Sequence, residues 1–342
     1  MKKNRITILL FLFLAVAAGI LIMKNRKSTI KEELKDFAVK DTASITKIFM
    51  ADKSPSSITL TREAPGQWTV NGKFAARWDA ITTLLETINE VDVRTPVAKS
   101  GFDNVIKALA TSGTKVELYS KDKLIKTYYV GGSTQDQMGT FMMIDKSSTP
   151  FVTYIPGFNG YLSTRYFTGE SSWRDRTVFN YFNDEIAAIN VEYPGTEKRY
   201  SFAVNPKTFT ATSLDTHEPS ITDTAKVGRY VGLFKHVNFE GFADGVSRDV
   251  KDSVVRTTPI AIITITDTKG TKDVLKAYLK MVNKRDSLLE DEHGKPVIYD
   301  VDRMFAVINN GKDFVVIQHY VFDGILASFD YFKKAAAKKP RV

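Results

Sequence analysis

The stretch Phe141–Leu162, FMMIDKSSTPFVTYIPGFNGYL, decides the fold because it occurs twice. Phe305–Leu326, FAVINNGKDFVVIQHYVFDGIL, aligns with it without a gap, 164 residues later, and is identical at six of 22 positions. Unrelated segments of average composition would share about one or two. Both copies have the pattern of a strand, a polar turn and a second strand, and a Tyr-Phe pair follows each, at 166–167 and 331–332. An internal repeat of this kind indicates a duplicated unit.

Each copy lies near the end of a longer unit with the same order of elements. In the first unit we expect strands at 45–50, 57–62, 67–70 and 73–75, helices at 77–89 and 102–110, and strands at 115–119, 124–130, 140–144 and 151–155. In the second we expect a helix that Thr222 or Asp223 caps, a helix at 248–255, and strands at 260–266, 274–282, 304–309 and 314–320. We therefore predict two duplicated α+β repeats, each a curved antiparallel sheet with helices on one face.

The start of the chain predicts a membrane anchor. Ile6–Met23 has 18 residues, of which only Thr7 is polar, and a basic run follows at 24–27. At 1.5 Å per residue this segment spans about 27 Å, close to the hydrocarbon thickness of a bilayer. A cleaved signal peptide is the alternative, because residues 15–17 have an A-x-A pattern. We expect an uncleaved, single-pass helix in the bacterial inner membrane, with the body of the protein in the periplasm.

The predicted fold class is thus α+β, with an N-terminal transmembrane helix followed by the two repeats. The predicted organisation is a cytoplasmic basic head (1–5), a transmembrane anchor (6–23), a stalk (24–40), repeat 1 (41–168), a junction (169–183), repeat 2 (184–332) and a basic tail (333–342).

The net charge of +9 is concentrated at the two ends of the chain. Residues 1–31 contribute +7 and residues 333–342 contribute +5, which leaves the body at −3. A nucleic-acid-binding protein needs its basic surface on the folded part, so we predict no nucleic-acid partner. The absence of cysteine excludes disulfides, thiolate catalysis and Cys-ligated zinc.

The sequence motifs do not indicate an enzyme. The four histidines stand at 217, 236, 293 and 319, and no two have the HxH, HxxxH or HExxH spacing of a zinc site. The chain has no G-x-S-x-G elbow and no P-loop. We therefore predict a protein that is not an enzyme, with no catalytic residue, no cofactor and no metal ion.

The connection Arg285–Arg303, RDSLLEDEHGKPVIYDVDR, is the clearest departure from the repeat. It has 19 residues, where the corresponding segment 131–139 has nine. It contains the run Glu290, Asp291, Glu292 and His293, and clustered carboxylates can bind a divalent cation or act as acid and base. Three interpretations stay open: a solvated hairpin tip, which we favour, a partner-binding loop, and a catalytic or metal-binding loop.

Aromatic residues form the second group of candidates. Tyr154 and Tyr161 could line a groove for a ligand, although aromatic side chains more often serve the core. Trp173 lies in the junction with Phe179, Tyr181 and Phe182, and we expect these side chains to dock the repeats at their junction. Trp173, Tyr154 and Tyr161 are therefore candidate residues for binding a partner or ligand, beside Glu290–His293.

Two stretches carry a resemblance to a known family. They are Pro65–Gly72, PGQWTVNG, and the segment from Gly131-Gly132 to Tyr154. Together with the order of the elements over about 45–330, they resemble a bacterial family known only as a domain of unknown function. Some members of that family are encoded beside ABC-type and gliding-associated transport components, which implies an accessory role in the cell envelope. The resemblance implies no catalytic residue.

We expect a non-catalytic, membrane-anchored cell-envelope protein that binds an envelope protein as an accessory component, in a complex that can include transport components. The first alternative is a glycan- or peptide-binding module with an aromatic cleft between the repeats. The second is a hydrolase or metal-dependent enzyme that uses the 285–303 loop.

Overall fold

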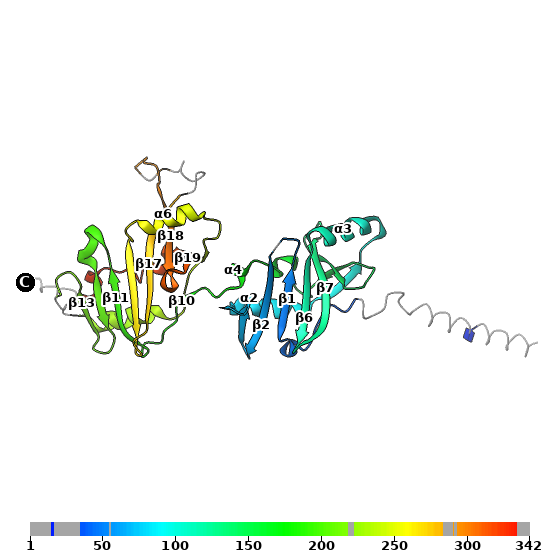
Figure 1. Ribbon diagram of the computed structural model, residues 1–342, viewed down its shortest axis with the longest axis horizontal. Helices are drawn as coiled ribbons and strands as arrows, with labels where there is room; N and C mark the ends of the chain where they lie inside the picture. The colour runs from blue at the N-terminus through cyan, green and yellow to red at the C-terminus, as the bar shows by residue number, and fades with distance from the viewer. Residues whose placement is uncertain are drawn as a thin grey trace, which may run out of the picture. The chain divides into compact units, whose positions relative to one another are not determined.

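The structure is a computed structural model that describes residues 15–16, 35–54, 56–217, 222–282, 290 and 293–333. The chain divides into two compact units, Met1–Asp175 (unit 1) and Arg176–Val342 (unit 2) (Figure 1). The boundary between them falls inside residues 169–183, the segment that we predict as a junction.

Unit 1 is built on an antiparallel sheet with the strand order β4-β3-β2-β1-β6-β7-β8-β9-β5. The strands are β1 (Lys47–Ala51), β2 (Ser57–Ala64), β3 (Gln67–Val70), β4 (Phe74–Ala75), β5 (Asp92–Pro96), β6 (Thr114–Ser120), β7 (Lys123–Ser133), β8 (Thr140–Ile144) and β9 (Phe151–Tyr154). The helices are α2 (Trp78–Glu90), α3 (Phe102–Ser112) and α4 (Glu170–Trp173).

Unit 2 contains a second antiparallel sheet, with the order β13-β12-β11-β16-β17-β18-β19-β15, and a small sheet of β10 and β14. The strands are β10 (Thr177–Phe179), β11 (Ile186–Glu192), β12 (Phe202–Asn205), β13 (Thr210–Ser213), β14 (Val237–Asn238), β15 (Gly241–Phe242), β16 (Ala261–Asp267), β17 (Lys272–Met281), β18 (Tyr299–Ile308) and β19 (Asp313–Gln318). The helices are α5 (Thr224–Val231), α6 (Arg248–Arg256) and α7 (His319–Phe322).

The two large sheets have the same topology. The order β3-β2-β1-β6-β7-β8-β9-β5 of unit 1 corresponds strand by strand to β13-β12-β11-β16-β17-β18-β19-β15 of unit 2. The repeated stretch also keeps its register, since Phe141 lies opposite Val152 and Phe305 lies opposite Val316. Both members of the first pair are 164 residues from their counterparts in the second. The chain therefore contains one folding unit twice.

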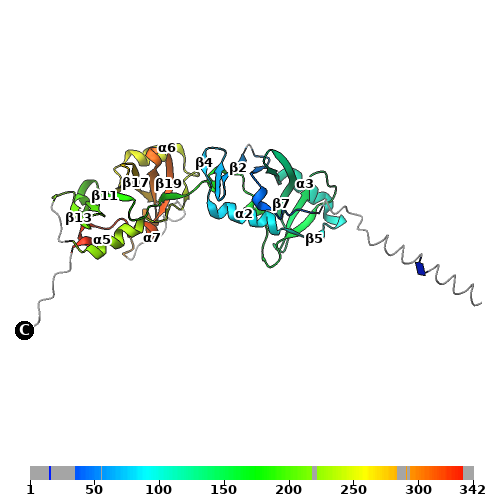
Figure 2. The same cartoon turned by 90° about the horizontal axis from the view of Figure 1, so that it is seen from below.

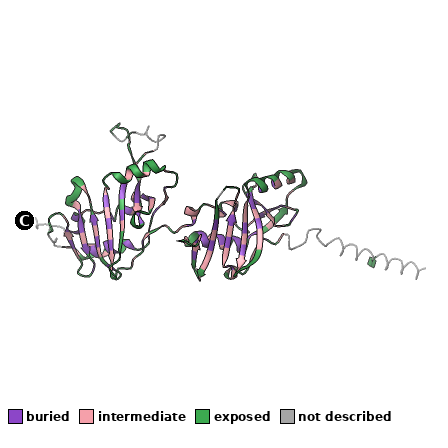
Figure 3. Ribbon diagram, viewed as in Figure 1, coloured by how far each residue is buried: buried purple, intermediate pink, exposed green. Residues whose placement is uncertain are grey.

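One face of each sheet packs against the first long helix and forms the main core. In unit 1 this helix is α2, which buries Ala80, Ile81, Leu84 and Ile88 at helical spacing. In unit 2 it is α5, which begins where the Asp223 carboxylate accepts hydrogen bonds from the N–H groups of Ala225 and Lys226. Strand residues alternate between buried and partly exposed positions (Figure 3), as expected for a sheet with one core face.

The opposite face of each sheet carries a second helix, so the prediction of helices on one face is wrong. In unit 2 the β17 residues Leu275 and Ala277 point into the main core, whereas Tyr278 belongs to a separate apolar cluster with Phe305 and Val254 of α6. Figure 2 shows α5 and α6 on opposite sides of this sheet. The physical reason is that the second face also carries apolar side chains, Tyr278 of β17 and Phe305 and Val307 of β18, which α6 partly shields from water.

The structure contradicts the predicted transmembrane helix. In the part of the chain that the structure describes, no helix has both the length and the apolar character needed to cross a bilayer. The longest described helix, α2, has 13 residues and is amphipathic, whereas a bilayer needs about 20 apolar residues. The predicted single-pass location in the inner membrane, the periplasmic body, the signal anchor and the membrane as a partner are corrected with it.

Most of the predicted terminal segments lie outside the described residues. Of the predicted anchor the structure describes only Ala15 and Val16, and of the basic tail only Lys333. The basic head at 1–5 is not described. The end of the predicted stalk belongs to unit 1, because Phe37 is buried in its core and packs edge-on against Tyr128 and Phe151.

The sequence does not predict the edge strands β5 and β15, which end the strand order of the two large sheets. β5 has the sequence DVRTP and pairs with β9 at the edge of the sheet. Four of its five residues are exposed, so it lacks the apolar alternation that marks a strand. β15 has only two residues. Backbone pairing with β9 and β19, rather than side-chain burial, forms these strands.

Candidate partner-binding site

Trp173 is a core residue of unit 1. Its side chain is fully buried, its ring stacks on Phe167 with 4.2 Å between the centroids, and its indole Nε1 donates a hydrogen bond to the carbonyl oxygen of Phe167 at 2.8 Å. A side chain with no exposed surface cannot contact a partner of the folded protein. Phe179, from the same predicted junction, is likewise buried, in the core of unit 2.

Tyr154 and Tyr161 are half-buried and keep part of their surface exposed. Tyr154 lies in β9 opposite Asp92, and the Arg94 guanidinium stands 4.7 Å from the centroid of its ring. Tyr161 lies between β9 and the short 3₁₀ helix Ser163–Arg165. Their role in binding a glycan or peptide stays a prediction.

The acidic run of the long hairpin is only partly described. Glu290 and His293 are exposed, and Glu290 forms an isolated bridge with Pro296. Asp291 and Glu292 lie outside the described residues. Within the described ranges no group of three or more His, Asp or Glu side chains could hold a metal ion. That search does not reach the complete run, so a metal-binding or catalytic role of this loop stays a prediction.

The described base of the long hairpin is an ordered extension of the unit 2 sheet. We call residues 279–282 and 298–303 the hairpin root. Its two arms pair, because Met281 lies opposite Tyr299 and the N–H of Val282 donates to the carbonyl oxygen of Ile298 at 3.0 Å. β18 has ten residues, whereas its counterpart β8 in unit 1 has five. The added length is therefore specific to unit 2.

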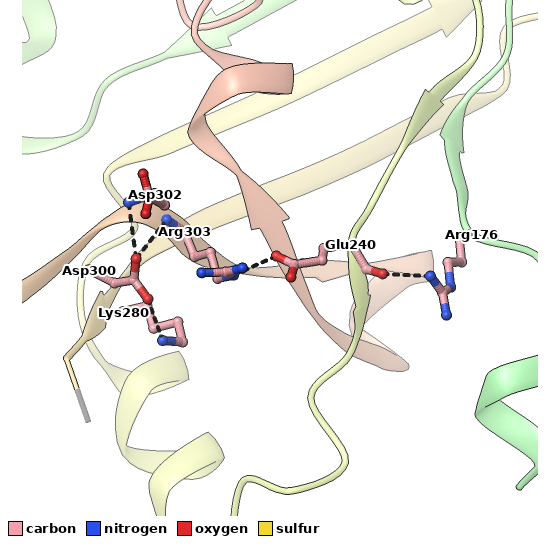
Figure 4. Close-up of polar contacts among 6 residues, drawn as sticks. All are labelled: Arg176, Glu240, Lys280, Asp300, Asp302 and Arg303. Carbon is pink, nitrogen blue, oxygen red and sulfur yellow. Dashed lines mark hydrogen bonds and ion pairs between the residues drawn. The ribbon is translucent and has the colours of Figure 1, made fainter. Parts of the chain in front are cut away.

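An ion pair joins the two arms of the hairpin root (Figure 4). The Lys280 Nζ of β17 donates to the Asp300 carboxylate of β18 at 2.6 Å, and only 14% and 16% of the two side chains are exposed. The other carboxylate oxygen of Asp300 accepts hydrogen bonds from the N–H groups of Asp302 and Arg303, each at 3.0 Å. Charge-assisted bonds of this kind are stronger than neutral ones, and those to the N–H groups fix the backbone at the start of β18.

The environment of Asp300 favours its ionised form. Burial by itself raises the pKa of Asp300, but the hydrogen bonds from Lys280 and from the two backbone N–H groups outweigh that effect. The pKa of Asp300 therefore lies below its ordinary value. Since the carboxylate is ionised at neutral pH, the pair acts as a clamp between the two strands rather than as a general acid.

A second ion pair connects the hairpin root to the rest of unit 2. The Arg303 Nε donates to the Glu240 carboxylate at 2.7 Å, and this hydrogen bond raises the pKa of the Arg303 guanidinium. The Glu240 backbone is held as well, because its N–H donates to Val316 of β19 at 2.8 Å and its carbonyl accepts from Arg176 at 2.8 Å (Figure 4). The arms are thus fixed to β19 and to the first residues of unit 2.

Only part of this network has a counterpart in unit 1. Asp136 precedes Asp300 by 164 residues and has the same local role, since its carboxylate accepts from the N–H of Met138 two residues later. The positions of Lys280, Arg303 and Glu240 are occupied in unit 1 by Ser133, Gly139 and Arg94. The aspartate therefore belongs to the repeated fold, and its charged neighbours are specific to unit 2.

Five large apolar side chains are exposed on the hairpin root. They range from 42% exposed at Leu279 to 72% at Val301, and the full set is Leu279, Met281, Ile298, Tyr299 and Val301. Among the described residues of 133–139, the corresponding part of unit 1, no large apolar residue is exposed. Single exposed apolar residues are normal. Met281, Tyr299 and Val301 share one face of the hairpin root, because Met281 pairs with Tyr299 and Val301 lies two residues further along β18, and such a group marks a surface for interaction.

The sequence alone indicates part of this site. It singles out 285–303 by its length, but Lys280 and Glu240 stand 20 and 63 residues before their partners Asp300 and Arg303. Pairs at such separations follow from strand register, which the sequence does not show. One usable signal is present, because the separation of 164 that joins the repeated stretches also joins Asp136 to Asp300.

The fold and the site define a protein of two duplicated sheet-rich units, one of which has an ordered apolar extension. Residues 67–255 match the family model DUF4340, a domain of unknown function. This match covers more than half of the chain, so the protein belongs to that family, and the predicted membership of a domain-of-unknown-function family is confirmed. The matched region runs from β3 to α6, and the hairpin root lies outside it. No curated protein and no solved structure matches the chain.

Proposed function

We propose that this protein is a non-catalytic binding component that engages a partner protein through the hairpin root of unit 2. The observation that carries the proposal is the group of five exposed apolar side chains at a place where unit 1 has none. Full burial of one such side chain contributes about 1.5–3 kcal/mol. Two or three of them therefore match much of the roughly 8 kcal/mol that a micromolar complex requires, before the costs of association.

The charged network supports the same proposal. Lys280, Asp300 and Arg303 hold the arms of the hairpin root in one arrangement in the free protein. A surface that is ordered before binding loses less conformational entropy when the partner binds.

The test compares protein capture by three forms of the tagged chain. The double variant Met281→Lys, Val301→Lys places two charges on the patch, and Leu124→Lys places one on an exposed residue of unit 1. All three residues are exposed, so circular dichroism and thermal melting should be close to those of the wild type. We expect a partner that the wild type and Leu124→Lys retain in stoichiometric amounts and that the double variant loses. Equal retention by all three chains contradicts the proposal.

A further inference from the structure

A groove lies on the outer face of unit 2, between α6 and the sheet. It has a volume of about 880 Å³ and extends from α6 across β17 and β18 to the turn at 310–312. Tyr278 of β17 and Phe314 of β19 line it, and the rings of Phe314 and Phe305 are 4.9 Å apart. We call this feature the α6 groove.

Four cations line the α6 groove: Lys251 and Arg256 on α6, Lys276 on β17, and Lys312 in the turn before β19. None of them forms an ion pair with another of the described residues. Asp252 is the one carboxylate among the described lining residues, and it already faces Arg248 at 3.9 Å. The groove therefore has an excess of three positive charges, although the body of the protein has a net charge of −3 outside its basic ends.

The α6 groove also has an apolar component that the fold leaves uncovered. α6 has no fully buried residue, and Val255, which lines the groove, is 46% exposed. Phe314 is half-buried, with the Lys251 ammonium 5.9 Å from the centroid of its ring. An apolar side chain placed beside Val255 and Phe314 would remove this surface from water.

The corresponding groove of unit 1 provides a comparison within the same chain. It lies beneath α3, has a volume of about 570 Å³, and contains two carboxylates, Asp52 and Asp145, together with three lysines. One of these lysines, Lys115, is paired with Glu117 at 2.6 Å. The two grooves occupy the same place in the repeated fold, but the described lining residues carry an excess of one positive charge in unit 1 and of three in the α6 groove.

We propose that the α6 groove binds an acidic segment of a partner protein that also carries an apolar side chain. Carboxylates of the segment pair with Arg256, Lys276 and Lys312, and the apolar side chain packs on Val255 and Phe314. A nucleic acid fits less well, because its phosphates require basic surface along a path longer than the groove and the body around it is acidic overall. The site goes beyond the proposed function, since it lies outside the hairpin root and does not depend on it.

The test measures the fluorescence anisotropy of a labelled synthetic peptide, in which Glu alternates with Leu, upon titration with the full chain. Peptides of the same length in which Lys alternates with Leu, and Glu with Ser, serve as ligand controls. We expect the Glu–Leu peptide to bind most tightly and its affinity to fall with added salt. Lys276→Glu and Arg256→Glu should each weaken it about tenfold, since each replaces an attraction by a repulsion. Both residues are exposed, so the variants should melt like the wild type.

The matched control is Lys146→Glu in the groove of unit 1. Lys146 precedes Asn310 of the α6 groove by 164 residues and is exposed. This variant should bind the Glu–Leu peptide as the wild type does. The proposal is overturned if Lys276→Glu and Arg256→Glu keep full affinity, if Lys146→Glu weakens binding as much as they do, or if the Lys–Leu peptide binds equally well. Equally tight binding of the Glu–Ser peptide or of inorganic polyphosphate also overturns it, because the groove would then be a simple anion site.

Discussion

Units 1 and 2 place a glycine and a tyrosine at the same point of their sheets. Val130 lies opposite Met142 as Ala277 lies opposite Ala306, so the next residues, Gly131 and Tyr278, are equivalent. A Cβ at Gly131 would stand 2.9 Å from Leu109 Cδ2, so α3 packs directly on the strand. In unit 2 the Tyr278 side chain occupies this space, and the groove is larger, at about 880 Å³ against 570 Å³.

The two units therefore share a scaffold and differ in their surfaces. Strand order and hairpin register are common to both. The hairpin root and the α6 groove are features that unit 2 adds or enlarges at positions where unit 1 has Gly, Ser or a short turn. The shared positions therefore explain the fold, and we look for function at the positions that differ.

The largest expected effect separates the stability of unit 1 from that of unit 2. Trp173→Ala removes a fully buried side chain from unit 1 and should lower the free energy of unfolding by about 3–5 kcal/mol. Hydrogen exchange followed by mass spectrometry should then show lost protection in peptides of unit 1 and unchanged protection in peptides of unit 2. Trp78→Ala is the control, because Trp78 is 60% exposed and its loss should change little. Equal losses of protection in both units would show that the two units do not lose stability separately.

A smaller effect tests the close packing of α3 on its strand. Gly131→Ala should destabilise unit 1 by about 1–3 kcal/mol, because the added methyl group meets Leu109 at 2.9 Å and the Phe141 carbonyl oxygen at 3.1 Å. The neighbouring Gly132→Ala is the control, since nothing lies within 4 Å of its Cβ position. Urea unfolding followed by tryptophan fluorescence measures both, as all three tryptophans belong to unit 1. Identical midpoints for the two variants would contradict the account of Gly131.

The equivalent aspartates give the next comparison. Asp300→Asn removes the charge that holds Lys280 and should destabilise unit 2 by about 1–2 kcal/mol. This is less than the roughly 1.5–3 kcal/mol of a hydrogen bond to a charged group, because the amide oxygen can still accept from the backbone N–H groups. Asp136→Asn should have a smaller effect, because Asp136 is exposed and has no charged partner at hydrogen-bond distance among the described residues. Urea unfolding followed by circular dichroism compares the two. A larger loss of stability for Asp136→Asn would mean that the hydrogen bonds of the turn, and not the ion pair with Lys280, stabilise the protein.

The smallest effect is a dependence on pH. The pKa of Asp300 is lower in the folded protein than in the unfolded chain, where it is about 3.9. The ionised carboxylate therefore makes its full contribution to the free energy of unfolding above the unfolded pKa. This contribution is lost as the pH falls through the lower, folded pKa. The difference in stability between the wild type and Asp300→Asn should therefore be constant from about pH 7 to 5 and shrink below about pH 4. Urea titrations at several pH values measure this difference. A difference that grows as the pH falls would contradict the sign of the shift.

The sequence predicts the repeated elements well because both copies bury the same apolar pattern. Phe141 and Phe305 occupy matching strand positions, and Asp223 caps α5 as its residue type suggests. The pattern does not predict β5, whose exposed residues carry no apolar periodicity. The sequence predicts that Trp173 docks the repeats at their junction and makes it a candidate for binding, yet the structure buries it in the core of unit 1, since residue type alone does not distinguish docking from packing.

The functional surfaces are harder to predict because they depend on register. Lys280 meets Asp300 only through the pairing of β17 with β18, which contains an irregularity between Leu279 and Met281. The second helix-covered face of the sheet, with Tyr278 of β17 and Phe305 of β18, is hard to recognise in the sequence because lysines flank Tyr278 at the alternate positions of β17. The predicted transmembrane helix rested on the hydropathy of 6–23 and the basic run after it, and the described helices do not support it.

We propose that a partner binds where unit 2 differs from unit 1. To test this proposal, one photo-crosslinking amino acid is placed at Val301 of the hairpin root and, in a second chain, at Leu124 of unit 1, both exposed. After illumination in the presence of the native protein mixture, we predict a discrete covalent adduct at Val301 and none at Leu124. The same adduct at both positions, or an adduct at Leu124 alone, would contradict the claim.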